Sequence, residues 1–471
     1  MGNNHSAPNG KRGIGNVHPL VMVTFIILFA VLLTHLIPAG TFQNVTVNGR
    51  TTIDVSSYTR IAQTPFNLIH LPTTIMKSFA SVLPIIVLIC AGGGAFEVLR
   101  KTGTVNAVIG LVIKETHGKE KYALWIMGLG FSAISCTITH EVFIPFTALC
   151  ITLALSLGYE PFVGVALLIL SSINGMISSA LQPATVNLQS MLGLPLYSGL
   201  GYRIIVLVIF SIVSTAYLIR YAEKTRKDPS KSVILNISEE EKKTYDDLNS
   251  VVCSQMNVRH VLVVVSMVAI FAAMVIGGLR FKWENYDFAG LFLIMAIICG
   301  LIGGLSLNDV ARCYVSGVNN LTSTVIIIGL ASSVANVLIS GNIIHTIIHS
   351  LTKGLGGWPP FLMPIGIVFI VFICTIFIPS FNGKLPMLIP ILGPACAALR
   401  VTQQECAFAY TFGDCFAILL LPYQAGLVGF LGVGHVSYGS WIKFFWKLNV
   451  LWILLGCIIL IIFAAIGVGP F

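Results

Sequence analysis

Apolar runs long enough to cross a bilayer follow one another along almost the whole chain, and no other feature limits its fold as strongly. Examples are residues 19–37, 260–279 and 448–468, each near the roughly 18–20 residues that a membrane-spanning helix requires. Hydrophobic residues make up 56% of the chain and charged residues 10%, whereas a soluble domain carries about 25% charged residues. Strands of a transmembrane β-barrel alternate and carry much weaker apolar runs. The sequence therefore predicts an all-α polytopic membrane protein.

One arrangement of apolar segments occurs twice, at residues 132–187 and again at residues 375–424. In each copy an apolar segment stops at a short polar tip, resumes, and is followed by a second apolar segment that proline breaks. Pro183 and Pro422 occupy corresponding places, because a Leu-Gly pair follows each at the same distance. Paired interrupted segments in two halves of a membrane chain are typical of transporter binding sites. We therefore expect two inverted-topology repeats, each with a re-entrant hairpin and a proline-broken transmembrane helix.

The pattern of polarity predicts five parts of the chain. They are a cytoplasmic N-terminal tail (1–18), a first transmembrane repeat (19–220), a cytoplasmic linker (221–259), a connecting transmembrane helix (260–279) and a second, inverted repeat (287–471). Lys11 and Arg12 precede the first span, which places the N-terminus in the cytoplasm of a cell (inner) membrane protein and the C-terminus outside. Smaller predicted elements are an external β-like excursion at 38–66, an interfacial helix at 104–116, and a loop that carries Asp309 and Arg312.

Charge and cysteine content exclude other classes of protein. The net charge of +9 follows the loops, as the positive-inside rule requires, so we expect no nucleic-acid partner. The eleven cysteines show no Cys-x-x-Cys spacing and lie mostly singly in apolar runs. Such a pattern indicates neither a metal site nor a disulfide framework.

Polar and ionisable residues at the tips and breaks are the candidate binding groups. A charged side chain inside the membrane costs at least about 2.5–3.5 kcal/mol on insertion scales, so each one requires a reason. Non-helical backbone at that depth is tolerated only where it lines protein or a watery cavity, and helix N-termini that face such a cavity favour a carboxylate. The residues predicted to bind substrate are Thr139, His140, Glu141, Gln182, Thr185, Asn187, Asn382, Gly383, Lys384, Asp414 and Gln424. The candidates for an ion site are Asn174 and Asp414.

Each candidate has a structural alternative that the residues alone leave open. Glu141 and Lys384 lie at the two tips and are able to pair as an ion bridge, because pairing is the usual way in which such charges are tolerated. Asp414 fits hydrogen bonding between helices as well as a cation or proton role. His140 fits a proton relay or a hydrogen-bonding tip residue. The neutral polar residues fit either substrate coordination or the satisfaction of unwound backbone.

Several segments resemble a known group of transporters. They include "GGGAFEVLRKTGTVNAVI", "GLPLYSGLGYRIIV" and "FAYTFGDCFAILLLPYQAGLVGFLGVGHVSYGSWIKF", and they resemble the YfcC-like branch of the anaerobic dicarboxylate-carrier group from about His18 to the C-terminus. The resemblance implies the ion-transporter superfamily fold, with two inverted repeats and opposed re-entrant hairpins. It also implies secondary transport of basic amino acids, including arginine/ornithine exchange, or of dicarboxylates, and a homodimer formed through the early spans.

The sequence departs from that resemblance at both tips. Members typically carry a paired acidic motif where this chain has Glu141 followed by Val142, and a Gly/Ser-rich tip ending in Gln where it has Lys384. The Phe-Gly-Asp that ends at Asp414 is kept, and Gln182 replaces the common Asn before the proline of the first break. Losing one acid and gaining one lysine makes the cavity more positive, which favours an anionic or zwitterionic substrate. Lys384 is also a candidate substitute for a bound cation, which would make transport independent of sodium.

We therefore predict a secondary active transporter for a small carboxylate-bearing metabolite, either an amino acid or a di- or monocarboxylate. It would work by alternating access as an antiporter or cation-coupled symporter, with no cofactor beyond Na⁺ or H⁺ as a coupling ion. The specific alternative is an arginine/ornithine-type basic amino-acid antiporter. Other classes are a passive channel and a membrane-embedded enzyme with His140 and Glu141 as a catalytic pair; the latter lacks a recognisable nucleophile or metal motif.

Overall fold

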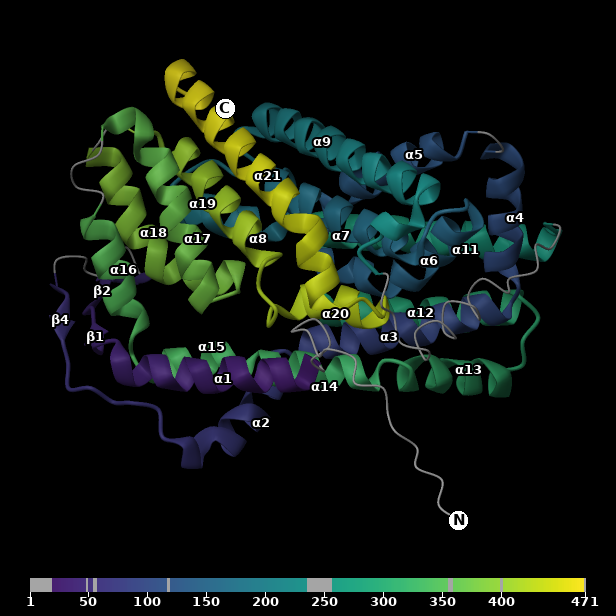
Figure 1. Ribbon diagram of the computed structural model, residues 1–471, viewed down its shortest axis with the longest axis horizontal. Helices are drawn as coiled ribbons and strands as arrows, with labels where there is room; N and C mark the ends of the chain where they lie inside the picture. Colours follow the sequence, from purple (N-terminus) through teal and green to yellow (C-terminus); the bar gives the residue numbers. More distant parts are fainter. Residues whose placement is uncertain are drawn as a thin grey trace, which may run out of the picture.

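Helices account for most of the computed structural model, which describes residues 19–47, 50–53, 57–116, 119–234, 256–354, 359–398 and 401–469 (Figure 1). Among these residues, seven helices are long and apolar enough to cross a membrane, judged by length and composition. Shorter apolar stretches cover Leu20–Leu36, His140–Ser156 and Met363–Phe377. The prediction of an all-α polytopic membrane protein is confirmed. The predicted tail at 1–18 and most of the predicted linker lie outside the described residues.

The helices of the first half run from α1 to α9, which extends to Lys227 and so into the predicted linker 221–259, and those of the second half begin with α11 at Val258. In chain order the first group is α1 (Pro19–Leu36), α2 (Leu71–Ser81), α3 (Leu83–Lys101), α4 (Thr104–Thr116), α5 (Glu120–Ser135), the 3₁₀ segment η4 (His140–Phe146), α6 (Thr147–Ser156), α7 (Pro161–Ser178), α8 (Pro183–Met191) and α9 (Leu200–Lys227). The second group is α11 (Val258–Ile276), α12 (Asn285–Ile302), α13 (Leu307–Asn319), α14 (Thr322–Ala331), α15 (Ser333–Ser340), α16 (Ile344–Lys353), α17 (Met363–Phe377), α18 (Phe381–Ala398), α19 (Gln403–Ile418), α20 (Ala425–Val433) and α21 (Tyr438–Ile466).

Among the smaller predicted elements, the helix at 104–116 is confirmed as α4. The excursion at 38–66 contains strands β1 (Gly40–Thr41), β2 (Asn44–Val47), β3 (Arg50–Ile53) and β4 (Thr59–Arg60), and they form two antiparallel pairs, β1 with β4 and β2 with β3. The predicted loop at Asp309 is wrong, because these residues begin helix α13. Ser306 caps that helix by accepting a hydrogen bond from the Asp309 N–H at 3.2 Å, a Ser-x-x-Asp signal that the sequence carries.

Helices α7 and α19 form the interior of the assembly. Every residue from Phe162 to Ser178 in α7 and from Gln404 to Ile418 in α19 is buried. Helices that are apolar around their whole circumference are expected to be surrounded by protein or lipid. Both helices precede a predicted break, so the two breaks begin from buried, fixed positions.

The two interior helices have matching neighbours. Helix α7 packs against α5, α6 and α9, and α19 packs against α17, α18 and α21; α7 and α19 also contact each other. In Figure 1, α9 and α21 lie along the same side of the molecule. This matching order agrees with two repeats of one design. The inverted orientation of the second repeat stays a prediction.

Close packing of α7 against α6 depends on a glycine, which gives the first testable prediction. A Cβ atom at Gly164 would lie 2.3 Å from the carbonyl oxygen of Cys150 and 2.6 Å from the amide nitrogen of Ile151. Because both are backbone atoms, the helices must separate to accept it. We expect Gly164→Ala to lower the free energy of unfolding by about 1–3 kcal/mol, as overpacking usually does. The measurement is the thermal unfolding midpoint of the purified protein in detergent.

Gly290 in α12 provides a matched control, since a Cβ there meets nothing within 4 Å. Gly290→Ala should leave the midpoint unchanged or raise it, because alanine favours a helix over glycine by up to about 1 kcal/mol. Equal midpoints for the two variants would contradict the close approach of α6 and α7.

Candidate functional site

Four non-helical gaps appear at or beside the predicted tips and breaks, but Asn382, Gly383 and Lys384, which the sequence predicts at the second tip, lie in the first turn of α18. The first tip (136–139) separates α5 from η4, and the first break (179–182) separates α7 from α8. The second tip (378–380) separates α17 from α18, and the second break (419–424) separates α19 from α20. We keep these four names below.

Local sequence explains both breaks. At the first break, Gln182 is extended (φ −72°, ψ 142°), as expected for a residue that precedes proline, and Ser179 is left-handed (φ 47°). At the second break, Gln424 is also extended, and its Oε1 accepts a hydrogen bond from the Leu427 N–H at 2.5 Å. Gln424 therefore caps α20 and supplies one of the partners that the first turn of a helix lacks.

Within each half, the break is hydrogen-bonded to the region of the tip. Gln182 Nε2 donates to the carbonyl oxygens of Ser135 at 2.8 Å and Ile138 at 3.2 Å. In the second half, the Tyr423 hydroxyl donates to the carbonyl oxygen of Ile376, at the end of α17. Thr185 Oγ1 donates to the Ser179 carbonyl oxygen at 2.8 Å. In this structure Gln182 and Thr185 thus satisfy unwound backbone, which is one of the two roles open to them from sequence.

Between the halves, each tip region meets the break of the other half. Helix α8 packs against α18, and Asn187 Nδ2 lies 3.3 Å from Asn382 Oδ1. Segment η4 packs against α20, and a Cβ at Gly426 would lie 2.4 Å from Nε2 of His140. We call these the two crossed contacts. They bring residues more than 190 positions apart in sequence to one junction, since the Asn187 and Asn382 pair is separated by 195 residues.

The predicted residues at the first tip have short-range partners. His140 is buried, and its Nδ1 lies 3.4 Å from Oε2 of the adjacent Glu141, whose side chain is 15% exposed. Thr139 Oγ1 lies 3.3 Å from Oδ1 of Asn285, at the start of α12. The partial exposure of Glu141 leaves its carboxylate accessible.

Lys384 and Asp414 form a fully buried ion pair. Both side chains are 0% exposed, and Lys384 Nζ contacts Asp414 Oδ1. The same nitrogen also lies 3.3 Å from the carbonyl oxygens of Ile378 and Ser380 at the second tip. The ion bridge between Glu141 and Lys384 that the sequence left open is therefore wrong. Because Asp414 neutralises Lys384 locally, the lysine adds no free positive charge at this point.

The first-half candidate for an ion site is neutral and bonded to neighbouring helices. Asn174 Oδ1 accepts a hydrogen bond from Ser214 Oγ of α9 at 2.9 Å, and its Nδ2 lies 3.4 Å from Ser132 Oγ of α5. In contrast, Asn187, Asn382 and Gly383 are exposed. The crossed contact of α8 and α18 therefore offers accessible amides, whereas the charged pair lies beneath the surface.

Sequence reasoning missed Arg203, which lies in the first turn of α9 and is 0% exposed. Its Nη1 donates to the carbonyl oxygens of Ser178 and Ser179, each at 3.3 Å, at the end of α7. The guanidinium carbon lies 4.7 Å from the ring centroid of Phe408 in α19, a distance at which cation–π attraction operates. Arg203 thus ties the first break to the second half. The available signal was an arginine inside an apolar run.

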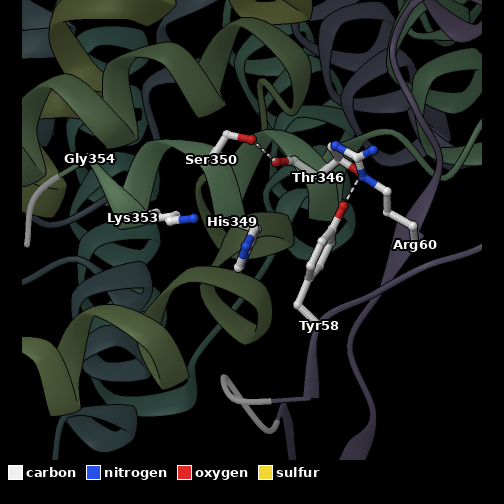
Figure 2. Close-up of a pocket in the computed structure, with 7 residues that line it drawn as sticks. All are labelled: Tyr58, Arg60, Thr346, His349, Ser350, Lys353 and Gly354. Atoms are coloured by element: carbon white, nitrogen blue, oxygen red, sulfur yellow. Dashed lines mark hydrogen bonds between the residues drawn. The ribbon is translucent and has the colours of Figure 1, made fainter.

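Two hollows of the surface lie apart from these residues. One, of about 510 Å³, is lined by residues of β4 and α16 that include Arg60, His349 and Lys353. Figure 2 shows the ring of Tyr58 beside His349, and its hydroxyl donates to Thr346 Oγ1 at 3.0 Å. The other hollow, of about 590 Å³, lies between α3, α6, α13 and α20. Neither is lined by any residue predicted to bind substrate.

Comparison with known proteins identifies the family. The model of the C4-dicarboxylate anaerobic carriers (DcuC) matches residues 18–465. The chain belongs to this family. It is thus a multi-pass membrane transporter, acting in a lipid bilayer on small molecules.

Two relatives and two solved structures are similar to the chain. An uncharacterised protein of Haemophilus influenzae (strain Rd) is 26% identical over 414 residues, which is 86% of this chain and 80% of that protein. YfcC of Escherichia coli (strain K12), provisionally named a basic amino acid antiporter, is 24% identical over 467 residues, 90% of this chain and 91% of that protein. The YdaH transporter of Alcanivorax borkumensis gives a TM-score of 0.45 at 14% identity, over 96% of this chain and 99% of that one. MtrF of Neisseria gonorrhoeae, described with a class of antimetabolite efflux pumps, gives 0.44 at 13% identity, over 96% of each chain.

The crossed contact of α8 and α18 predicts a specific cross-link. In a background without the eleven native cysteines, Asn187→Cys and Asn382→Cys should join under mild oxidation or with a short bifunctional thiol reagent. A protease site placed in the hydrophilic block 221–259 then separates the halves. We expect the joined protein to keep its full mass on a non-reducing gel after cleavage.

Gly130 supplies the control position, because it is exposed on α5 and a Cβ there meets nothing within 4 Å. Gly130→Cys combined with Asn382→Cys should release two fragments. Joining of the control pair with equal efficiency, or failure of the first pair with every reagent, would contradict the crossed arrangement.

Proposed function

We propose that the chain is a secondary active transporter that moves a small carboxylate-bearing metabolite across the membrane by alternating access. The observation that carries this proposal is the pair of crossed contacts, α8 with α18 and η4 with α20. Each joins a tip region of one half to a break of the other. A site that lies between two repeats can open to either side when one repeat moves against the other.

Backbone chemistry supports a ligand site at this junction. Interrupted helices at membrane depth are tolerated where they are buried in protein or line a watery cavity. The junction has both kinds of surroundings, since Gln182 and Thr185 are buried while Asn187, Asn382 and Gly383 are exposed. The exposed amides are the first groups that an entering metabolite would meet.

The ligand chemistry that fits is that of a carboxylate. The amide N–H groups of Asn187 and Asn382 donate without carrying charge, and the first turn of α18, where Ser380 Oγ caps the Gly383 N–H at 3.1 Å, contributes a positive helix end. The buried pair of Lys384 and Asp414 is neutral as a unit. A ligand carboxylate would therefore be held by neutral donors. Lys384 of the buried pair is close in sequence to Asn382.

The full set of residues that we assign to the substrate site includes those that hold its backbone as well as those that face the ligand. It comprises Thr139, His140, Glu141, Gln182, Thr185, Asn187, Asn382, Gly383, Lys384, Asp414 and Gln424, with Asn174 and Asp414 as candidates for ion binding.

A second candidate is a basic amino acid antiporter of the arginine/ornithine type. The partly exposed carboxylate of Glu141 favours it, because a cationic side chain or an α-ammonium group needs such a partner. The name of the relative YfcC points in the same direction. Both candidates share a carboxylate-bearing substrate, and they differ in the charge of the rest of the molecule.

The arrangement in the membrane completes the proposal. We place the protein in the cell (inner) membrane with a cytoplasmic N-terminus and an external C-terminus, on the basis of Lys11 and Arg12 before the first span. The divisions 19–220 and 287–471 are proposed as the two inverted repeats, joined by the connecting helix 260–279. A homodimer formed through the early spans is proposed from the family resemblance.

Counterflow in proteoliposomes tests the function. The panel contains arginine, ornithine, neutral amino acids, succinate and short monocarboxylates. Preloading vesicles with an unlabelled substrate should accelerate uptake of the same labelled compound, because an alternating-access carrier returns faster when it is loaded. Absence of acceleration for the whole panel would reject the proposal. Acceleration by arginine and ornithine alone would select the second candidate.

Variants at the crossed contact sharpen the same assay. Asn187→Ala and Asn382→Ala should each raise KM by about two- to tenfold, since one neutral hydrogen bond contributes about 0.5–1.5 kcal/mol and 1.4 kcal/mol corresponds to tenfold. Asn319→Ala on the exposed surface of α13 is the control and should transport as the wild type does. If KM were unchanged in all three variants, the two amides would not belong to the substrate site.

A further inference from the structure

The ammonium group of Lys384 lies in a cradle of oxygen atoms. Its three N–H donors have three acceptors, namely Asp414 Oδ1 and the carbonyl oxygens of Ile378 and Ser380, the two carbonyls at 3.3 Å. The Thr375 hydroxyl lies 3.2 Å from the same carboxylate oxygen. Lys384, Asp414 and Thr375 are all 0% exposed. The cradle thus combines one carboxylate with main-chain carbonyls and excludes water.

The Ile378 carbonyl is available because helix α17 ends there, whereas Ser380 lies in the second tip just before α18 and its carbonyl oxygen also accepts the Lys384 backbone N–H at 3.4 Å. Helix α17 stops at Phe377, and Ile378 leaves the helical region with φ −128° and ψ 88°. The last carbonyls of a helix lack partners within it and carry the negative end of its dipole. Lys384 extends from the first turn of α18 back to this end of α17. Unwound carbonyls and helix C-terminal ends are the groups that bind Na⁺ in transporters with interrupted helices.

The first half holds its corresponding carbonyls with a neutral group. There the donor to Ser135 and Ile138 is the amide of Gln182. Asn174, the counterpart of Asp414 by position relative to the breaks, is an uncharged amide that bonds to hydroxyl groups of Ser132 and Ser214. Backbone satisfaction at a tip therefore requires a donor but no charge. The positive charge of Lys384 neutralises the negative charge of the Asp414 carboxylate.

A second oxygen of that carboxylate is unused. Within the described part of the chain, Asp414 Oδ2 is buried without a hydrogen-bond partner. A lysine ammonium satisfies one carboxylate oxygen here, whereas a small metal cation is able to contact both. The site accordingly has the donor atoms of a monovalent cation site and one coordination position that lysine leaves open.

We propose that the Lys384 ammonium is a tethered cation that occupies a latent sodium site made by Asp414, Thr375 and the carbonyls of Ile378 and Ser380. The wild-type protein then needs no free Na⁺ at this place. Removal of the lysine side chain opens the site to Na⁺. The prediction about transport rests on the proposed function. The prediction about Na⁺ binding does not, because binding is measured without substrate.

The test compares melting temperatures of purified protein in NaCl, LiCl, KCl and choline chloride at equal ionic strength. Wild type should melt at the same temperature in Na⁺ and choline. Lys384→Ala should melt lower in choline, by on the order of 5 °C or more, because Asp414 is left buried and unpaired. Na⁺ should restore at least about half of that loss with saturable concentration dependence, as a ligand specific to the folded state does.

Two control variants separate a cation site from a simple structural brace. Lys384→Met fills the space without charge, and Lys384→Ala combined with Asp414→Asn removes the carboxylate. Neither should show recovery specific to Na⁺. Equal melting of Lys384→Ala in Na⁺ and choline would overturn the proposal, as would equal recovery in the double variant.

Wild-type protein provides a measurement that does not depend on a variant folding. Its initial rate of substrate exchange in proteoliposomes should be the same with Na⁺ and with choline on both sides, and a requirement for Na⁺ would overturn the inference. If the panel shows no transport at all, the proposed function fails while the melting series still decides whether Lys384 replaces a cation.

Discussion

Inside a bilayer every backbone N–H and C=O group needs a partner within the protein, and the rest of this structure depends on how that requirement is met where helices stop. Four helices end at the tips and breaks in the middle of the chain's two halves. At each gap a side chain replaces the missing helical hydrogen bonds. Gln182 serves the first tip, Arg203 the first break, Lys384 and Tyr423 the second tip with the end of α17, and Gln424 the second break, where it caps α20.

The side chains that supply hydrogen bonds to the backbone at the gaps also join the two halves. Arg203 donates to carbonyls at the end of α7 and lies over Phe408 of α19, so one side chain serves the first break and contacts the second half. The crossed contacts of α8 with α18 and η4 with α20 act at the same junction. Movement of one half against the other would therefore change the surroundings of every gap together. This is the physical basis for placing substrate binding and alternating access at one place.

At the junction, charged side chains differ from neutral polar side chains in how they find partners. Amides and hydroxyls are distributed over both halves, where each finds a backbone or side-chain partner. The buried charges of Lys384 and Asp414 instead cancel each other, because an isolated ion in a dry interior costs several kcal/mol more than a paired one. Arg203, a third buried charge, is instead held by carbonyl oxygens and lies over the Phe408 ring. The exposed groups at the junction are Asn187 and Asn382, and Glu141 is partly exposed.

The residues alone predict the class of the protein, the order of its main elements and the region of each gap. Length and hydropathy indicate which segments span, and proline after a polar run indicates the two breaks, although α18 continues through Pro386, Pro390 and Pro394. Thus α4 and both breaks appear where the residues predict them, whereas Asn382, Gly383 and Lys384 of the predicted second tip begin helix α18. The amphipathic helix α13 stands where a loop is predicted, because its exposed face carries polar residues like those of a loop, although Ser306 and Asp309 signal its start.

Which polar groups meet depends on how the helices pack in three dimensions. Because the two tips correspond in sequence, Lys384 and Glu141 are candidate partners. In the structure the partner of Lys384 is Asp414, 30 residues further along. Arg203 was hidden in an apolar run, and its partners lie 24 and 25 residues before it. Pairing of buried charges depends on the three-dimensional packing of α9, α17, α18 and α19. A hydropathy pattern records how deep a residue lies, but not which neighbouring helix it faces.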